Sequence, residues 1–335
     1  MRPAILWKSR PDNHVQCVLC AHFCNIADGE TGKCHVRMNW QGELYTLVAD
    51  TIAALNIDPV EKKPLFHFLP GTETLSFGTQ GCNFSCLFCQ NFQLSQPLPD
   101  SGFVLGTTVS PEELIRHALR AGTKSISYTY SEPTIFAELA SQTAEQACEH
   151  GLKNILVSNA FQSPQALSLL KEIIHAANFD LKSFSDAFYQ NICGARLKPV
   201  LNTIKKARKF GWWIEITTLL IPGYNDSKSE LEAIANFIHD ELGKDVPWHV
   251  SRFHPTFKLL KAPPTPISSI ERALEAGSKY GVRYVYSGNI PGHKAENTYC
   301  YKCGQLLVSR IGFTTTYNGD GTCPACAVRH AGVWK

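Results

Sequence analysis

The stretch Gly81-Cys82-Asn83-Phe84-Ser85-Cys86-Leu87-Phe88-Cys89-Gln90-Asn91 carries three cysteines in the pattern Cys-x3-Cys-x2-Cys. It follows a predicted strand over residues 75–78, so the cysteines are expected in a loop at the end of that strand. A structural zinc site normally has four protein ligands, whereas three thiolates on a [4Fe-4S] cubane leave one of its four irons open. The pattern therefore favours an iron–sulfur cluster held by Cys82, Cys86 and Cys89 over a zinc site completed by a histidine.

Downstream of this loop, short β-rich runs alternate with helical stretches. Ser110-Pro111-Glu112-Glu113 predicts a helix start, because serine caps the first turn and proline and acidic residues favour it. Further strands are predicted over residues 125–129, 154–158, 179–182, 213–219, 249–253 and 282–286. The alternation predicts an α/β protein with a mostly parallel sheet, whose reactive groups gather at the carboxyl ends of the strands.

The cysteines also divide the chain, because eleven of the thirteen fall into three clusters. We predict an N-terminal cysteine-rich metal-binding module over residues 1–65, a central α/β domain over 66–295 and a small C-terminal module over 296–335. The N-terminus lacks the apolar core of a secretory signal, and no stretch is apolar enough to cross a bilayer. We therefore expect a cytoplasmic protein with reduced thiols that serve metals rather than disulfides.

The overall charge limits the class of partner. Lysine and arginine total 32 against 29 aspartate and glutamate residues, which gives a net charge of +3 in 335 residues. Neither a nucleic-acid polymer nor an anionic membrane is indicated as the main partner by so small an excess.

Two outer cysteine sets have metal-ligand spacing. The C-terminal set has two Cys-x2-Cys pairs around a β-rich spacer, which is the pattern of a zinc ribbon, although a single iron would use the same ligands. The N-terminal set favours zinc first and a second iron–sulfur cluster as the alternative, and a nearby histidine could replace one thiolate. The C-terminal ligands are Cys300, Cys303, Cys323 and Cys326, and the N-terminal ligands are Cys17, Cys20, Cys24 and Cys34.

The central loop resembles the signature of the radical S-adenosylmethionine (SAM) superfamily, including the aromatic Phe88 before the last cysteine. The resemblance implies that SAM chelates the open iron and that an electron cleaves it to a 5′-deoxyadenosyl radical. It also implies that Phe88 lies against the adenine. Further SAM contacts are implied at three later strand ends, by Ser131 and Glu132, Ser158 and Asn159, and Asp180 and Lys182. This chain has Tyr-Ser-Glu-Pro where many members carry Gly-Gly-Glu, and Ala160 where a glycine is usual.

A wider resemblance covers most of the chain. Residues 58–71, 78–82, 220–226 and 248–255 resemble the AmmeMemoRadiSam-system radical SAM enzymes, a branch close to pyruvate formate-lyase activating enzyme. This implies a partial (β/α)6 TIM-like barrel with the two outer cysteine modules attached. It also implies an electron donor such as flavodoxin or ferredoxin, and association with Memo-like and AMMECR-like proteins.

Two functions of different classes remain open at this stage. The first is a radical SAM enzyme of the activating type that abstracts hydrogen from a protein or a small molecule. The second is a metal-stabilised scaffold that binds partners in a Memo/AMMECR-like system. Candidates for the substrate pocket are His249, Arg252 and His254, which lie at or after a late strand.

Overall fold

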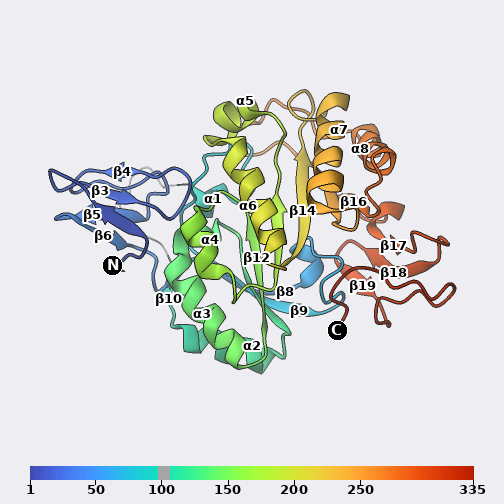
Figure 1. Ribbon diagram of the computed structural model, residues 1–335, viewed down its shortest axis with the longest axis horizontal. Helices are drawn as coiled ribbons and strands as arrows, with labels where there is room; N and C mark the ends of the chain where they lie inside the picture. The colour runs from blue at the N-terminus through green and yellow to red at the C-terminus, as the bar shows by residue number, and fades with distance from the viewer. Residues whose placement is uncertain (97–105) are drawn as a thin grey trace.

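The computed structural model describes residues 1–96 and 106–335. Its centre is an eight-stranded sheet in the order β16-β15-β14-β13-β12-β11-β9-β8, with helices packed along it (Figure 1). Neighbouring strands from β9 to β16 pair in parallel, and β8 pairs antiparallel with β9. The predicted α/β class with a mostly parallel sheet is confirmed. The strands of this sheet are β8 (Ala54–Pro59), β9 (Glu73–Gly78), β11 (Ser125–Tyr128), β12 (Lys153–Ser158), β13 (Ala176–Asp180), β14 (Trp213–Leu220), β15 (Trp248–Arg252) and β16 (Val285–Gly288).

The helices between these strands bury apolar faces against the sheet. α2 shows why the predicted helix starts hold: the Ser110 hydroxyl accepts from Glu113 N, and the Glu113 carboxylate accepts from Ser110 N. The α-helices are α1 (Phe92–Ser95), α2 (Pro111–Ala121), α3 (Ala137–Glu149), α4 (Pro164–Leu170), α5 (Asp186–Phe188), α6 (Leu197–Lys209), α7 (Lys228–Phe237) and α8 (Ile267–Lys279). Short 3-10 or π segments are η1 (Val60–Lys62), η2 (Pro133–Phe136), η3 (Tyr189–Cys193), η4 (Ile238–Leu242) and η5 (Lys294–Glu296).

The sheet begins earlier in the chain than the sequence predicted. β8 lies within the stretch assigned to the N-terminal module, yet it pairs along its whole length with β9. Three of its six residues are exposed, so it carries little of the buried apolar pattern that marks a core strand. β13 likewise ends at Asp180, and Lys182 lies beyond the strand instead of inside it.

The N-terminal region forms two small sheets, β1-β6-β5 and β2-β3-β4, which stand at one end of the molecule (Figure 1). A buried ion pair of 2.9 Å between Arg37 and Glu138 of α3 ties this region to the central domain. Its strands, with the pair β7 and β10, are β1 (Arg2–Pro3), β2 (Trp7–Ser9), β3 (Val15–Cys17), β4 (Asn25–Ile26), β5 (Arg37–Trp40), β6 (Glu43–Thr46), β7 (Thr51–Ile52) and β10 (Thr107–Thr108).

The C-terminal region adds a three-stranded sheet of β17 (Thr298–Tyr299), β18 (Leu306–Ile311) and β19 (Thr314–Thr316) at the opposite end (Figure 1). The buried Arg310 anchors it, because Nη2 donates to the Phe66 carbonyl at 2.8 Å and Nη1 donates to Thr298. The division into three domains remains a prediction. Among the described residues, no helix is long and apolar enough to cross a membrane.

Candidate active site

A cavity of about 730 Å³ lies at the carboxyl ends of the parallel strands. Its volume falls in the range of small-molecule sites, which is about 300–1,000 Å³. The loop after β9 contributes all three central cysteines to its wall. The other predicted residues that line it are Phe88, Ser131, Glu132, Ser158, Asn159, Asp180, Lys182 and His249. The structure therefore brings together the predicted cluster ligands and every predicted SAM contact.

The backbone of η3 holds the cysteine loop in place. Ser85 N donates to the Cys193 carbonyl at 2.9 Å, and Leu87 N donates to the Ile192 carbonyl at 3.0 Å. Two loop amides are thereby fixed between the first and last cysteines. Because these buried backbone amides are already hydrogen-bonded, the thiols of the loop are not needed to satisfy them and can face the cavity.

Unpartnered polar groups in the cavity wall fit a polar ligand. The hydroxyls of Ser131 and Thr217 are buried and have no hydrogen-bond partner among the described protein groups. Both residues line the cavity. Because buried hydroxyls without partners are costly, these two groups are available to bond a polar ligand in the cavity. With three thiols beside them, the donor set suits a three-cysteine cluster and a polar cofactor such as SAM.

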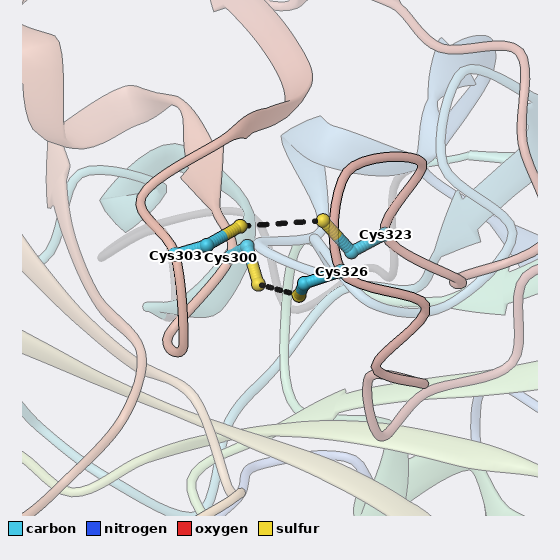
Figure 2. Close-up of side chains that lie close together, drawn as sticks. All are labelled: Cys300, Cys303, Cys323 and Cys326. Atoms are coloured by element: carbon cyan, nitrogen blue, oxygen red, sulfur yellow. Dashed lines mark hydrogen bonds between the residues drawn. The ribbon is translucent and has the colours of Figure 1, made fainter.

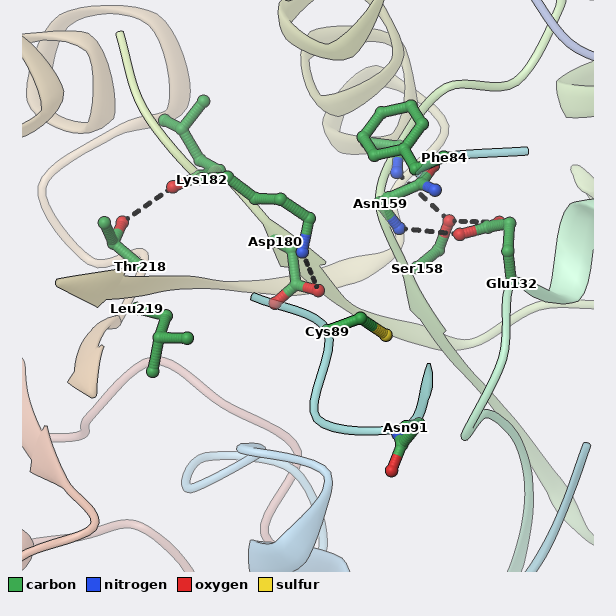
Figure 3. A network of polar contacts seen from close by, with 12 residues as sticks. Phe84, Cys89, Asn91, Glu132, Ser158, Asn159, Asp180, Lys182, Thr218 and Leu219 are labelled. Carbon is green, nitrogen blue, oxygen red and sulfur yellow. Dashed lines mark hydrogen bonds and ion pairs between the residues drawn. The ribbon is translucent and has the colours of Figure 1, made fainter. Parts of the chain in front are cut away.

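Glu132 joins the ends of β11 and β12. Its Oε1 accepts from Thr134 N at 3.0 Å, from the Thr134 hydroxyl and from the Ser158 hydroxyl at 2.8 Å. Its Oε2 accepts from Asn159 N at 2.8 Å, as Figure 3 shows. Burial raises the pKa of Glu132, although these bonds oppose the shift. The carboxylate thus fixes both loops, and Oε2 keeps a lone pair for a ligand.

Asp180 and Lys182 form an ion pair across the loop after β13. Lys182 Nζ lies 2.9 Å from Asp180 Oδ2 and 5.7 Å from the centre of the Phe88 ring. Figure 3 shows the two side chains turned toward each other above Cys89. Lys182 reaches this pair from the loop after β13 and not from the strand itself. A charged pair beside an aromatic ring suits a ligand with both polar and planar parts.

Sequence reasoning missed a second charged group in the same wall. Lys63 is 2% exposed, and its Nζ lies 2.6 Å from Asp58 Oδ2, which also accepts from the Tyr130 hydroxyl. Burial lowers the pKa of Lys63 to about 8, although the Asp58 carboxylate opposes the shift. Lys63 and Tyr130 both line the cavity. The order of residues 58–71 gives no signal for the contact with Tyr130, which requires β8, β9 and β11 to lie side by side.

The three substrate-pocket candidates separate in the structure. His249 lines the cavity, but its Nε2 lies 2.6 Å from the buried Glu215 Oε2, so this nitrogen is already engaged. Arg252 donates to the Thr265 carbonyl at 2.8 Å and is not among the cavity residues, and His254 is exposed. Arg252 and His254 therefore lie outside the lining of this cavity, and their part in substrate binding stays a prediction. The chain turns away from the cavity after β15, which the order of residues alone does not reveal.

The C-terminal cysteines converge on one point (Figure 2). Their sulfur atoms all lie within 4.8 Å of one another, and Cys300–Cys326 and Cys303–Cys323 are each 3.6 Å apart. Thiolates at about 2.3 Å from a tetrahedral zinc ion are separated by roughly 3.8 Å. The arrangement suits a single four-coordinate metal ion.

The N-terminal cysteines surround a smaller enclosed space. Cys17, Cys20, Cys24 and Cys34 all line it, together with His22, Arg37 and Asn83. His22 Nε2 lies 2.7 Å from the carbonyl of Asn83, the residue after Cys82. The N-terminal cysteine set therefore adjoins the loop of the central cavity.

Comparison with known proteins agrees with this site. The model of the radical SAM superfamily matches residues 77–238. An uncharacterized protein of Methanocaldococcus jannaschii is 44% identical over 313 residues, which cover 93% of this chain and 92% of that protein. The benzylsuccinate synthase activating enzyme of Thauera aromatica is 22% identical over 142 residues, 40% of this chain and 43% of that enzyme.

A solved structure shares the fold. A radical SAM methyltransferase from Sphaerobacter thermophilus superimposes with a TM-score of 0.51 at 16% sequence identity, over 71% of each chain. At this identity the likeness concerns the fold alone.

Proposed function

Because the chain belongs to the radical SAM superfamily, we propose that it cleaves SAM reductively and that the resulting 5′-deoxyadenosyl radical abstracts hydrogen from a protein or small-molecule substrate. The observation that carries the proposal is that the three central cysteines and the predicted SAM contacts line one cavity. It holds three loop thiols and two buried hydroxyls without partners, at the carboxyl ends of parallel strands. The enzyme is of the radical SAM activating type.

In this proposal Cys82, Cys86 and Cys89 hold a [4Fe-4S] cluster, and SAM fills the rest of the cavity beside it. When bound, the cluster supplies the electron that breaks the carbon–sulfur bond of SAM. Phe88 faces the adenine, and Lys182 holds a polar or charged group of the cofactor from the same side.

The loops after β11 and β12 position the methionine part of SAM. Glu132 keeps the loops after β11 and β12 in register, and its Oε2, which accepts from Asn159 N, has a second lone pair for an amino group. The unpartnered Ser131 hydroxyl lies on the same loop and can bond the carboxylate. The chain's own groups thus orient SAM beside the cysteine loop.

The substrate side extends toward the C-terminal module. Lys63, His249, Glu296 and Phe313 also line the cavity. A cavity with both cationic and acidic groups suits a polar substrate or a peptide segment. We propose that the substrate enters between the parallel sheet and the β18–β19 hairpin.

We also propose the finer assignments that the resemblance suggests. The chain is placed in the AmmeMemoRadiSam branch, with a partial (β/α)6 barrel, Memo-like and AMMECR-like partners, and flavodoxin or ferredoxin as electron donor. Zinc is assigned to the C-terminal cysteines, because the sulfur spacing of 3.6 Å suits one tetrahedral ion. These assignments rest on motifs and geometry and each is open to direct measurement.

The test is production of 5′-deoxyadenosine. The anaerobically reconstituted and reduced protein is incubated with SAM, beside Cys86→Ala and the matched control Cys148→Ala, whose cysteine is exposed and outside all three sets. We expect product from the wild type and from Cys148→Ala, and none from Cys86→Ala. Equal product from all three proteins, or none from a fully loaded wild type with its electron donor, contradicts the proposal and favours the partner-binding scaffold.

A further inference from the structure

We propose that His249 is the hydrogen-bond and proton acceptor for an O–H or N–H group of the substrate, and that Glu215 positions it by fixing which ring nitrogen carries the hydrogen. The inference rests on the proposed function for the radical, and it adds the chemical class of the molecule that the radical meets. Three observations support it: the bonds of Glu215, the free nitrogen of His249 and the place of His249 in the sheet.

The buried carboxylate of Glu215 in β14 accepts four hydrogen bonds. Its Oε1 accepts from His67 N at 2.8 Å and from Trp213 Nε1 at 2.9 Å, and its Oε2 accepts from Phe66 N at 2.9 Å and from His249. The first three donors are amide or indole N–H groups, which only donate. Burial raises the pKa of Glu215, but the hydrogen bonds, first the one from His249, outweigh burial and lower it. The carboxylate is therefore ionised, and the fourth bond requires a hydrogen on the histidine.

The His249 ring supplies this hydrogen from Nε2, which lies 2.6 Å from Glu215 Oε2. In a neutral imidazole one nitrogen carries the hydrogen and the other carries a lone pair, so the lone pair is at Nδ1. Neighbouring rings hold the imidazole in this orientation. The ring centre of Phe66 lies 4.6 Å away in an edge contact, and that of Tyr286 lies 5.3 Å away in a stacked one.

The Nδ1 atom of His249 is open to the cavity. His249 lines the cavity, whereas Glu215 does not. Among the described residues Nδ1 has no hydrogen-bond partner, and it is not one of the fully enclosed polar atoms that lack a partner. A molecule in the cavity can therefore reach its lone pair. The neighbouring Thr217 adds an unpartnered hydroxyl to the same wall.

The register of the sheet places His249 beside the proposed SAM site and not within it. Asp180 of β13 is opposite Thr217 of β14, which is opposite His249 of β15, and all three line the cavity. Neighbouring strands are about 4.8 Å apart, so His249 starts roughly 10 Å across the sheet from Asp180. Because Asp180 is a proposed SAM contact, this distance suits a substrate that lies next to SAM.

This arrangement favours a substrate with an O–H or N–H group close to the C–H bond that the radical attacks, such as an alcohol, an amine or an amide. The group donates a hydrogen bond to His249 Nδ1. When the proton transfers, the O–H or N–H bond breaks, an N–H bond forms at Nδ1 and the electron pair stays on the substrate. The resulting imidazolium is stabilised by the ionised Glu215, as the buried carboxylate does in a catalytic triad.

The first measurement locates the hydrogen on the ring. The reconstituted, oxidised protein is labelled with 15N in its imidazole rings, and its nitrogen spectrum at mildly alkaline pH is compared with that of His249→Gln to identify the His249 signals. We expect a hydrogen on Nε2 and none on Nδ1. In Glu215→Gln the amide both donates and accepts, so we expect the two tautomers to mix and the two signals to move together. A hydrogen on Nδ1 in the wild type, or unchanged signals in Glu215→Gln, would overturn the proposal.

The second measurement tests access to Nδ1 with diethyl pyrocarbonate, which acylates an imidazole nitrogen that carries a lone pair. Modified peptides are identified by mass spectrometry, with and without saturating SAM on the oxidised protein. The exposed His117 is the positive control, and the buried His67, whose ring nitrogens are both hydrogen-bonded, is the negative control. We expect His249 to be acylated in both samples.

Two results of the acylation experiment overturn the proposal. Absence of acylation shows that Nδ1 is closed to the cavity, and protection by SAM shows that SAM itself occupies this place. Neither measurement requires SAM cleavage. A protein that forms no 5′-deoxyadenosine but shows the expected tautomer and acylation would therefore refute the proposed function and leave the assignment of the His249 acceptor standing.

Discussion

Replacing Glu132 by glutamine tests how the loops around SAM are held. The Glu132 carboxylate accepts four hydrogen bonds, from Thr134 N, the Thr134 hydroxyl, the Ser158 hydroxyl and Asn159 N. In glutamine one oxygen becomes an NH2 group, which cannot accept. In the orientation that loses least, this group faces Asn159 N–H, and one buried backbone donor remains unpaired.

The expected magnitude follows from that single lost bond. An unpaired buried donor costs about 1–3 kcal/mol. Since 1.4 kcal/mol corresponds to a tenfold change, this weakens SAM binding by about 5- to 150-fold if the whole cost falls on the SAM-bound loops. The unfolding free energy falls by no more than the same amount.

A matched control separates the two effects. Glu215 is also fully buried and also accepts four hydrogen bonds, from Phe66 N, His67 N, Trp213 Nε1 and His249 Nε2. Glu215 itself does not line the cavity. We expect Glu215→Gln to lose comparable stability in denaturant unfolding while retaining SAM affinity in calorimetric titration of the reconstituted protein. Equal SAM affinity of Glu132→Gln and wild type, or equal losses in the two variants, would refute the reasoning.

Three further predictions concern stability and metal binding. Burial lowers the pKa of His67 to about 4, so on acidification the histidine is protonated in the unfolded chain before it is protonated in the folded one, and the free energy of unfolding falls by about 2 kcal/mol between pH values above 6.5 and pH 5. Urea unfolding should show this loss in the wild type and not in His67→Gln, and a wild-type stability that does not change with pH would contradict it. Gly78→Ala places a Cβ 2.2 Å from the Thr129 carbonyl oxygen, and we expect the free energy of unfolding to fall by about 1–3 kcal/mol and SAM to bind more weakly. An unchanged unfolding midpoint would contradict this, because it would show that the ends of β9 and β11 move apart without loss of stability. Cys303→Ser should remove one metal ion per chain without affecting SAM binding, and metal analysis that finds the full content would exclude the C-terminal site.

The parts of the fold that the sequence predicted are those set by local patterns. The capped start of α2 and the cysteine loop after β9 depend on residues close together in the chain, and both are present. β8 was missed because an antiparallel edge strand with exposed residues carries little buried periodicity. Its place in the sheet is fixed by pairing with β9, which is a tertiary contact.

The candidate site shows the same division. The strand-end rule brought Glu132, Asn159 and Asp180 to one cavity, because parallel strands end at the same edge. Arg252, the last residue of β15, does not line this cavity, since its side chain bonds the Thr265 carbonyl in the segment that follows the strand. The engagement of His249 by Glu215 depends on the register between β14 and β15, which the order of residues does not state.

The most direct test of the central claim is electron paramagnetic resonance of the reduced central cluster before and after addition of SAM. The sample is the variant Cys20→Ala/Cys34→Ala, so that no iron–sulfur signal from the N-terminal cysteines overlaps the signal of the central cluster. The control carries Cys82→Ala in addition. The account predicts a [4Fe-4S] signal that changes when SAM binds the open iron, and no such signal in the control. A cluster signal that is identical with and without saturating SAM would contradict it.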